Sequence, residues 1–165
     1  MKVPFSWLRE YVDWQGTPEE LAHLLTMSGT EVEGIDWVGA PRDPENLSRF
    51  VVGKVVTREK HPNADKLSLC TVDVGERNGG VKQIVCGADN FQAGDVVAVS
   101  MSGAVLENGL RLKKANLRGV ESDGMMMSEQ ELGYEEQRPG IVVLPSAWTI
   151  GAPLQDSLPV SAAVL

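Results

Sequence analysis

The hydrophobic pattern of this chain changes its period near residue 50. Before that point apolar residues recur at helical spacing: Phe5, Leu8 and Val12 follow an early proline, as in a short amphipathic helix. A second helix is predicted to begin at Thr17, the first residue of a Thr-Pro-Glu-Glu capping box, and to end at Ser28-Gly29, where glycine favours termination. The N-terminal part therefore predicts two short helices.

A strand and a linker are predicted between these helices and residue 50. Residues 31–38 alternate acidic and apolar side chains, which is typical of a strand with one face in water. Residues 39–46 are rich in glycine and proline and predict a linker and a domain boundary. The carboxylates of residues 31–38 have no histidine at ligand spacing, so we interpret them as a solvated face.

Beyond the linker the period is two, and glycine-containing turns separate the alternating segments. Five main strands are predicted, at residues 50–58, 67–74, 81–86, 96–100 and 118–127. A second hairpin is predicted around Asn108-Gly109, between the fourth strand and the last. Short strands without crossover helices favour a small, closed antiparallel β-barrel, with a Greek-key sandwich as the structural alternative. The predicted fold class is α+β.

A five-stranded barrel of this size is an OB-fold, whose ligands normally bind on strands two and three and on the loops after strands one and four. Here both loops are basic, so we expect two clusters of cations to converge on one face, with a further lysine, Lys54, on the first strand. The candidate binding residues are Lys54, Lys60, His61, Asn63, Lys66, Arg111, Lys113, Lys114 and Arg118.

The charge distribution limits how strongly such a face can bind. The chain carries a net charge of −8. Residues 49–128 nevertheless hold eleven basic and nine acidic side chains, and they are the only one of the three segments in which basic residues outnumber acidic ones. Residues 1–48 hold three basic and nine acidic side chains, and residues 129–165 hold one and five. A nucleic-acid contact should therefore be local, modest and sensitive to salt. Since the barrel carries only two phenylalanines, contact with the phosphate backbone is expected to outweigh base stacking.

The sequence contains no motif for catalysis or for metal binding. No phosphate-binding loop, nucleophile elbow or zinc spacing occurs, so neither a catalytic residue nor a metal site is predicted. The two cysteines, Cys70 and Cys86, lie in predicted strands and are interpreted as buried, reduced thiols. No apolar run approaches eighteen residues, and charge interrupts the N-terminus too early for a secretory signal. We therefore expect a cytoplasmic protein with no membrane partner and no DNA partner.

Several linked motifs of the barrel resemble the tRNA-binding OB domain of the EMAP-II type. They are Val52-Gly53-Lys54-Val55-Val56, His61 to Leu67, Ile84 to Asn90, Leu117 to Ser128-Glu129, and Glu131-Leu132-Gly133. The N-terminal residues, from Met1 to Val12 and from Leu21 to Glu33, are similar to the start of the bacterial phenylalanyl-tRNA synthetase β subunit. The resemblance spans essentially the whole chain.

The resemblance implies a particular domain organisation. Residues 1–40 are expected to form the first part of an N-terminal helical module and residues 41–152 the tRNA-binding OB-fold domain. Residues 153–165 are expected to return to the module, into which the barrel is inserted. The family's β subunit is several times longer, so the resemblance implies that this chain is a fragment and that the module is incomplete in it.

The resemblance also implies a function. It implies a non-catalytic tRNA-binding region of a class II ligase that attaches phenylalanine to tRNA(Phe), in an α2β2 heterotetramer with the α subunit. ATP and magnesium would serve the full enzyme, with no cofactor in this fragment. Two alternatives remain open at this point: a barrel that acts mainly as an assembly element, and a stand-alone tRNA chaperone, which the N-terminus disfavours.

Overall fold

The computed structural model describes residues 1–134 and 138–165, which form two compact units. Unit 1 combines the two chain ends, Met1–Gly39 and Ser161–Leu165, and unit 2 comprises Ala40–Val160. The elements of the described chain, in order, are α1 (Phe5–Tyr11), α2 (Pro18–Met27), β1 (Asp36–Gly39), α3 (Pro44–Leu47), β2 (Phe50–Lys60), β3 (Ser68–Asp73), η1 (Glu76–Asn78), β4 (Val81–Cys86), β5 (Val96–Ser100), β6 (Ala115–Leu117), β7 (Val120–Ser122), β8 (Met125–Met126), β9 (Val143–Leu144), η2 (Leu154–Asp156) and β10 (Ser161–Val164).

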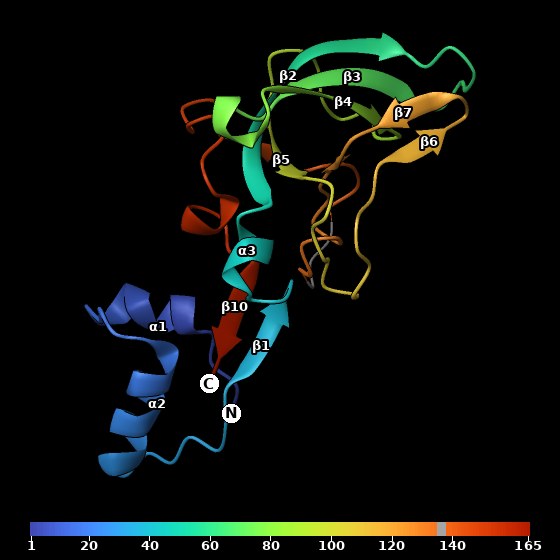
Figure 1. The fold of residues 1–165 in the computed structure, drawn as a ribbon. Helices are drawn as coiled ribbons and strands as arrows, with labels where there is room; N and C mark the ends of the chain where they lie inside the picture. The colour runs from blue at the N-terminus through green and yellow to red at the C-terminus, as the bar shows by residue number, and fades with distance from the viewer. Residues whose placement is uncertain (135–137) are drawn as a thin grey trace. The chain divides into compact units, whose positions relative to one another are not determined.

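Unit 1 contains α1, α2 and a two-stranded antiparallel sheet in which β1 pairs with β10 (Figure 1). The predicted capping box is present, because the Thr17 hydroxyl accepts from the Glu20 amide and the Glu20 carboxylate accepts from the Thr17 amide. Neither helix buries a residue, and large apolar side chains such as Trp7, Tyr11 and Met27 are exposed. Unit 1 therefore has almost no core of its own.

Unit 2 is the predicted antiparallel barrel. Its strands follow the order β4-β3-β2-β5-β8, with β9 added against β5. The path closes through hydrogen bonds from the last strands back to β4: the Asp123 amide donates to the Gln83 carbonyl at 2.8 Å, and the Val85 amide donates to the Ser122 hydroxyl at 3.0 Å. The prediction of a five-stranded OB-fold barrel in an α+β chain is confirmed.

Strand β2 is long enough to serve two neighbours. Its first half pairs with β5 and its second half with β3, with a register shift between Val55 and Thr57. Gly53 lies where the two pairings meet, and a Cβ there would approach the Val99 methyl to 2.6 Å and the Val72 methyl to 3.0 Å. Glycine thus allows close strand packing at the bend.

Two buried clusters lie on the two faces of β2 and β5. Alternate residues of β5 enter different clusters: Val97 and Val99 pack inside the barrel, whereas Val96 and Ala98 pack against its outer face. Because both faces are covered, all five residues of β5 are buried. This explains why β5 is a continuous apolar run rather than an alternating one.

The structure corrects several element boundaries. The predicted strand over residues 118–127 is divided into β7 and β8 by a bend at Asp123-Gly124. The predicted hairpin around Asn108-Gly109 is present as a short one: Val105 and Arg111 form a bridge, the Leu106 amide donates to the Leu110 carbonyl at 2.9 Å, and the Leu112 amide donates to the Ala104 carbonyl at 2.7 Å. The predicted strand over residues 31–38 is confined to β1, and the predicted linker contains α3, which Asp43 caps. Within residues 1–134 and 138–165, no helix has the length and apolar character needed to cross a bilayer.

Candidate functional site

His61 fastens the loop after β2, residues 61–67, to the two-stranded β6–β7 ribbon. The histidine is 2% exposed, and its Nδ1 accepts a hydrogen bond from the Asn63 amide at 3.0 Å. Nε2 therefore carries the proton and donates to the Leu117 carbonyl at 3.0 Å. The buried His61 side chain therefore joins loop 61–67 to the end of the β6–β7 ribbon, which lies next to it (Figure 1).

A second hydrogen bond reaches the tip of the ribbon. The Asn63 side-chain amide donates to the Arg118 carbonyl at 2.9 Å. Arg118 and Gly119 both have positive φ, 51° and 88°, as the two central residues of a type I′ hairpin turn require. The Asn116 side chain accepts from the Gly119 amide at 2.8 Å and completes the turn. Arg118, from the second predicted cluster, therefore lies beside loop 61–67, whereas Lys113 and Lys114 come before β6, at the other end of the ribbon.

The predicted cations differ in how far they are already engaged. Lys60 pairs with Asp65 at 3.1 Å, and Arg111 donates to the Gly103 carbonyl at 3.1 Å. Across the described residues, the exposed side chains of Lys66, Lys113 and Arg118 form no hydrogen bond or ion pair. Lys66, Lys113 and Arg118 are thus the cations best able to meet an external anion; together with Lys60, Arg111 and Lys114 we call them the basic face.

The base of the ribbon is held by a charged network around Asp123. Its carboxylate accepts from the Ser102 hydroxyl at 2.7 Å and lies 3.2 Å from the Lys114 ammonium and 3.6 Å from that of Lys82. Burial alone would raise the pKa of Asp123, but these partners outweigh it, so its pKa lies below the ordinary 3.8. The hydrogen bond and charge of Asp123, with a contribution from Glu121, raise the pKa of Lys114. Lys114 is therefore occupied at the ribbon's base.

Lys54 is the one predicted residue that the structure places away from the basic face. It pairs in register with Asp73 and Val96, whereas Lys60, beside loop 61–67, pairs with Ser68. Six residues of strand separate Lys54 from Lys60, a distance of about 20 Å at about 3.3 Å per residue. Lys54 is exposed but does not join the basic face.

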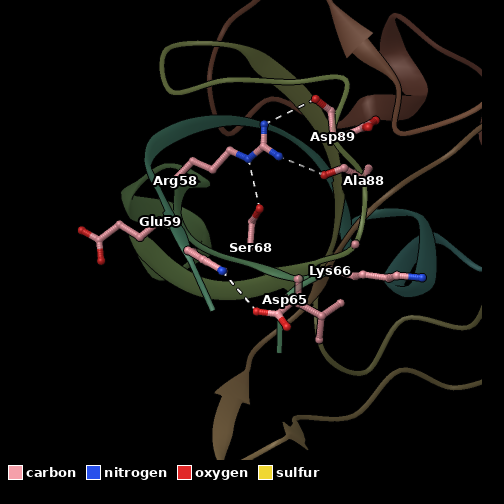
Figure 2. Close-up of a pocket in the computed structure, with 10 residues that line it drawn as sticks. Arg58, Glu59, Asp65, Lys66, Ser68, Ala88 and Asp89 are labelled. Carbon is pink, nitrogen blue, oxygen red and sulfur yellow. Dashed lines mark hydrogen bonds and ion pairs between the residues drawn. The ribbon is translucent and has the colours of Figure 1, made fainter. Parts of the chain in front are cut away.

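A groove of about 600 Å³ lies beside loop 61–67, between that loop and residues 87–89. Figure 2 shows the Arg58 guanidinium directed at the backbone of residues 88 and 89 and at the Ser68 hydroxyl. The lining contains three cationic and three anionic side chains: Arg58, Lys60, Lys66, Glu59, Asp65 and Asp89. Since these charges balance, the groove is not an anion site in itself.

Arg58 is a structural residue that the sequence did not single out. Its nitrogens donate to the Ser68 hydroxyl at 3.1 Å, the Ala88 carbonyl at 3.3 Å, and the Phe91 carbonyl, and its guanidinium lies 4.4 Å from the centre of the Phe91 ring. Arg58 thus ties the loop after β4 to β2. Its two carbonyl partners lie 30 and 33 residues away along the chain, so no local signal marks it.

Cys70 and Cys86 are both free, and neither belongs to the basic face. Cys70 is fully buried, and burial, followed by the effect of Cys86, raises the pKa of its thiol to about 11. Burial also raises the pKa of the half-buried Cys86. Both residues are protonated thiols at neutral pH, in agreement with their interpretation as reduced core residues.

Comparisons with known proteins give the chain a family context. Residues 50–153 match the family model described as "Putative tRNA binding domain". The phenylalanine–tRNA ligase beta subunit of Geobacter metallireducens is 47% identical over 158 residues, covering 96% of this chain and 19% of the relative. The same subunit of Bacillus licheniformis is 46% identical over 172 residues, covering 100% of this chain and 20% of the relative. The chain thus spans about a fifth of the length of these curated relatives.

A solved structure also matches part of the chain. It is a MetRS related protein from Pyrococcus horikoshii, with 26% sequence identity and a TM-score of 0.46. The match covers 62% of this chain and 85% of that protein.

Proposed function

The chain belongs to the family of tRNA-binding domains, and from this premise we propose that it contributes an auxiliary tRNA contact to a phenylalanine–tRNA ligase β subunit. The observation that carries the proposal is the fastening of loop 61–67 to the β6–β7 ribbon. The His61 and Asn63 hydrogen bonds hold Arg118, at the tip of the ribbon, beside the loop that carries Lys66, and this supports a shared basic surface.

The basic face suits a phosphate backbone rather than bases. Lys66, Lys113 and Arg118 offer exposed cationic groups, whereas the only aromatic side chain in loop 61–67 and the ribbon is the imidazole of His61, which is buried. Cations positioned on a rigid surface contact phosphate without reading sequence, and their contribution falls as salt rises. His61 is buried and Asn63 is bonded to the ribbon, so in this proposal both position the face.

Charge reversal of the two free lysines tests the proposal. The double variant K66E/K113E should lower the affinity of the 165-residue chain for tRNA(Phe) at low salt by at least tenfold, because two attractive contacts become repulsive. Lys114 is left intact because it pairs with Asp123, so its reversal would also disturb the fold. Affinity is measured by fluorescence anisotropy of labelled tRNA.

A matched control is available on the same barrel. Lys54 is exposed and lies outside the basic face, so K54E makes a similar change of charge without touching the proposed contact. We expect K54E to lose much less affinity than either single reversal, K66E or K113E. Equal losses in all three variants would indicate a diffuse charge effect and contradict a defined face.

The remaining assignments concern the full-length protein. As in the relatives, the enzyme would be a ligase; we propose a class II synthetase that uses ATP and magnesium, assembles with an α subunit as α2β2 and works in the cytoplasm. In that proposal its catalysis lies outside this chain. Among the described residues no three or more His, Cys, Asp or Glu side chains are grouped to hold a metal ion. We therefore assign no residue of this chain to either cofactor.

Assembly is a second candidate function, and unit 1 favours it. Trp7 and Tyr11 of α1 and Leu24 and Met27 of α2 are 49%, 72%, 52% and 74% exposed. An apolar surface of this kind, on a unit with almost no core, is typical of a protein–protein contact. We propose that unit 1, as part of the N-terminal module, packs against other parts of the synthetase while the barrel contacts tRNA.

A further inference from the structure

Arg118 has a backbone conformation that its side chain does not favour. Its φ is 51°, the left-handed region, and it is the only non-glycine residue with positive φ in the part of the chain that the structure describes. In a type I′ turn this position is normally asparagine, aspartate or glycine. In the left-handed region any Cβ comes close to the following carbonyl oxygen; glycine has no Cβ, and the short polar side chains of asparagine and aspartate offset the cost by local hydrogen bonds. The fold therefore bears a local cost for an arginine here.

Among the residues that the structure describes, no polar interaction of the Arg118 side chain offsets this cost. Its side chain is exposed, and throughout residues 1–134 and 138–165 no hydrogen bond or ion pair engages its guanidinium. By contrast, Arg58, Arg49 and Arg111 of the same unit each donate to a carbonyl or a carboxylate. A guanidinium held at a strained, rigid tip without an internal partner is suited to an external one.

The tip is also fixed on both sides of the arginine. The carbonyl of Leu117 accepts from His61 and that of Arg118 accepts from Asn63, while the Gly119 amide donates to Asn116. These bonds restrain three consecutive residues of the turn. The guanidinium therefore projects from a backbone whose position loop 61–67 determines.

We propose that Arg118 is the anchor of the RNA contact: its guanidinium, carried on a restrained turn, receives one backbone phosphate, and Asn63 is its positioning residue. The inference rests on the proposed tRNA-binding function and deepens it. Arginine suits this role because its planar fork donates two parallel hydrogen bonds to a phosphate, which an ammonium group does not. Because the backbone of the turn is already restrained, binding has to order only the side chain of Arg118.

The substitution R118N separates the binding role from the structural one. Asparagine tolerates the left-handed conformation, so the melting temperature should stay the same or rise. The affinity of the 165-residue chain for tRNA(Phe) should fall about tenfold, as for loss of one charge-assisted contact. The slope of log affinity against log salt should become shallower by about 0.7 to 0.9, one phosphate's share.

The control is R77N, the same substitution on η1, which is exposed and lies at the opposite end of β3 from loop 61–67. It should leave both affinity and slope unchanged. Tight binding by R118N with the wild-type slope would overturn the inference while leaving the proposed function standing. A wild-type chain that does not bind tRNA would overturn both.

The positioning role of Asn63 is tested by a double-mutant cycle. N63A removes the bond to the Arg118 carbonyl and should weaken binding several-fold in the wild-type chain. In the R118N background the same change should have little effect, because the side chain that Asn63 positions is already absent. Additive losses would show that Asn63 does not act through Arg118 and would overturn this part of the inference.

Discussion

His61 shows how one side chain supports the candidate site without being able to touch a ligand. Its imidazole is buried, and both ring nitrogens are occupied by backbone partners. One partner, Asn63, is two residues away, but the other, Leu117, is fifty-six residues away. The hydrogen bonds of this residue therefore carry the connection between loop 61–67 and the ribbon.

Removing the His61 imidazole should destabilise the barrel. H61A leaves the Asn63 amide and the Leu117 carbonyl without their partner, and we expect the free energy of unfolding to fall by about 1–3 kcal/mol. Urea denaturation followed by circular dichroism measures the change. His23 on α2 is exposed, so H23A provides a matched control that should change stability by less than about 0.5 kcal/mol. Equal midpoints for the two variants would contradict the structural role of His61.

The candidate residues were visible in the sequence, but their individual roles were not. His61, Asn63 and Arg118 were selected because they lie in the two loop regions where an OB-fold normally binds its ligand. Burial of His61 and the positive φ of Arg118 depend on contacts between distant segments. The same reason explains why Arg58 was missed and why Lys54 was grouped with residues about 20 Å away.

At the scale of elements, the β6–β7 ribbon is supported at both ends. Asn63 and His61 hold its tip, and Asp123, with Ser102 and Lys82, holds its base. The prediction of one continuous strand over residues 118–127 missed this arrangement. Gly124, with φ of 118°, and the bonds of Asp123 turn the chain between β7 and β8, so the two strands are not continuous.

The network at the ribbon's base should make stability depend on pH. The pKa of Asp123 is lowered in the folded state, so its contribution is present above the ordinary value of 3.8 and is lost as the pH falls below it. At pH 7 we expect D123N to reduce the free energy of unfolding by about 1 kcal/mol. The difference between D123N and wild type should shrink as the pH is lowered towards 2.5.

Urea titrations of both proteins across this pH range provide the measurement. Asp156, on η2, is exposed and has no ion pair among the described residues, so D156N serves as a control with the same change of charge. It should show no comparable loss at pH 7. A D123N defect that persists undiminished at pH 2.5 would contradict an electrostatic origin.

The barrel as a whole could be predicted because its alternating strands and turn residues agree with one fold. The alternation of acidic and apolar residues over 31–38 predicted a strand along the whole segment. In the structure only its last residues are paired, in β1. The pairing partner of β1 is β10, from the other end of the chain, so no local pattern fixes its length.

At the scale of the molecule, the chain combines a net charge of −8 with a small basic face. The acidic flanks repel nucleic acid at long range, and Lys66, Lys113 and Arg118 attract it at short range. The opposition of long-range repulsion and short-range attraction predicts that tRNA binds at the basic face with modest affinity. It also separates tRNA binding by the barrel from the alternative in which the barrel acts mainly as an assembly element, because such an element would show no salt-dependent attraction.

The salt dependence of tRNA binding by the wild-type 165-residue chain is the decisive measurement for the proposed phosphate contacts. Three phosphate contacts predict a line of log affinity against log salt concentration with a slope between about −2 and −3. We expect measurable binding of tRNA(Phe) at about 25 mM salt and this slope up to about 200 mM. No binding at the lowest salt, or a slope near zero, would contradict it and leave assembly as the function of the barrel.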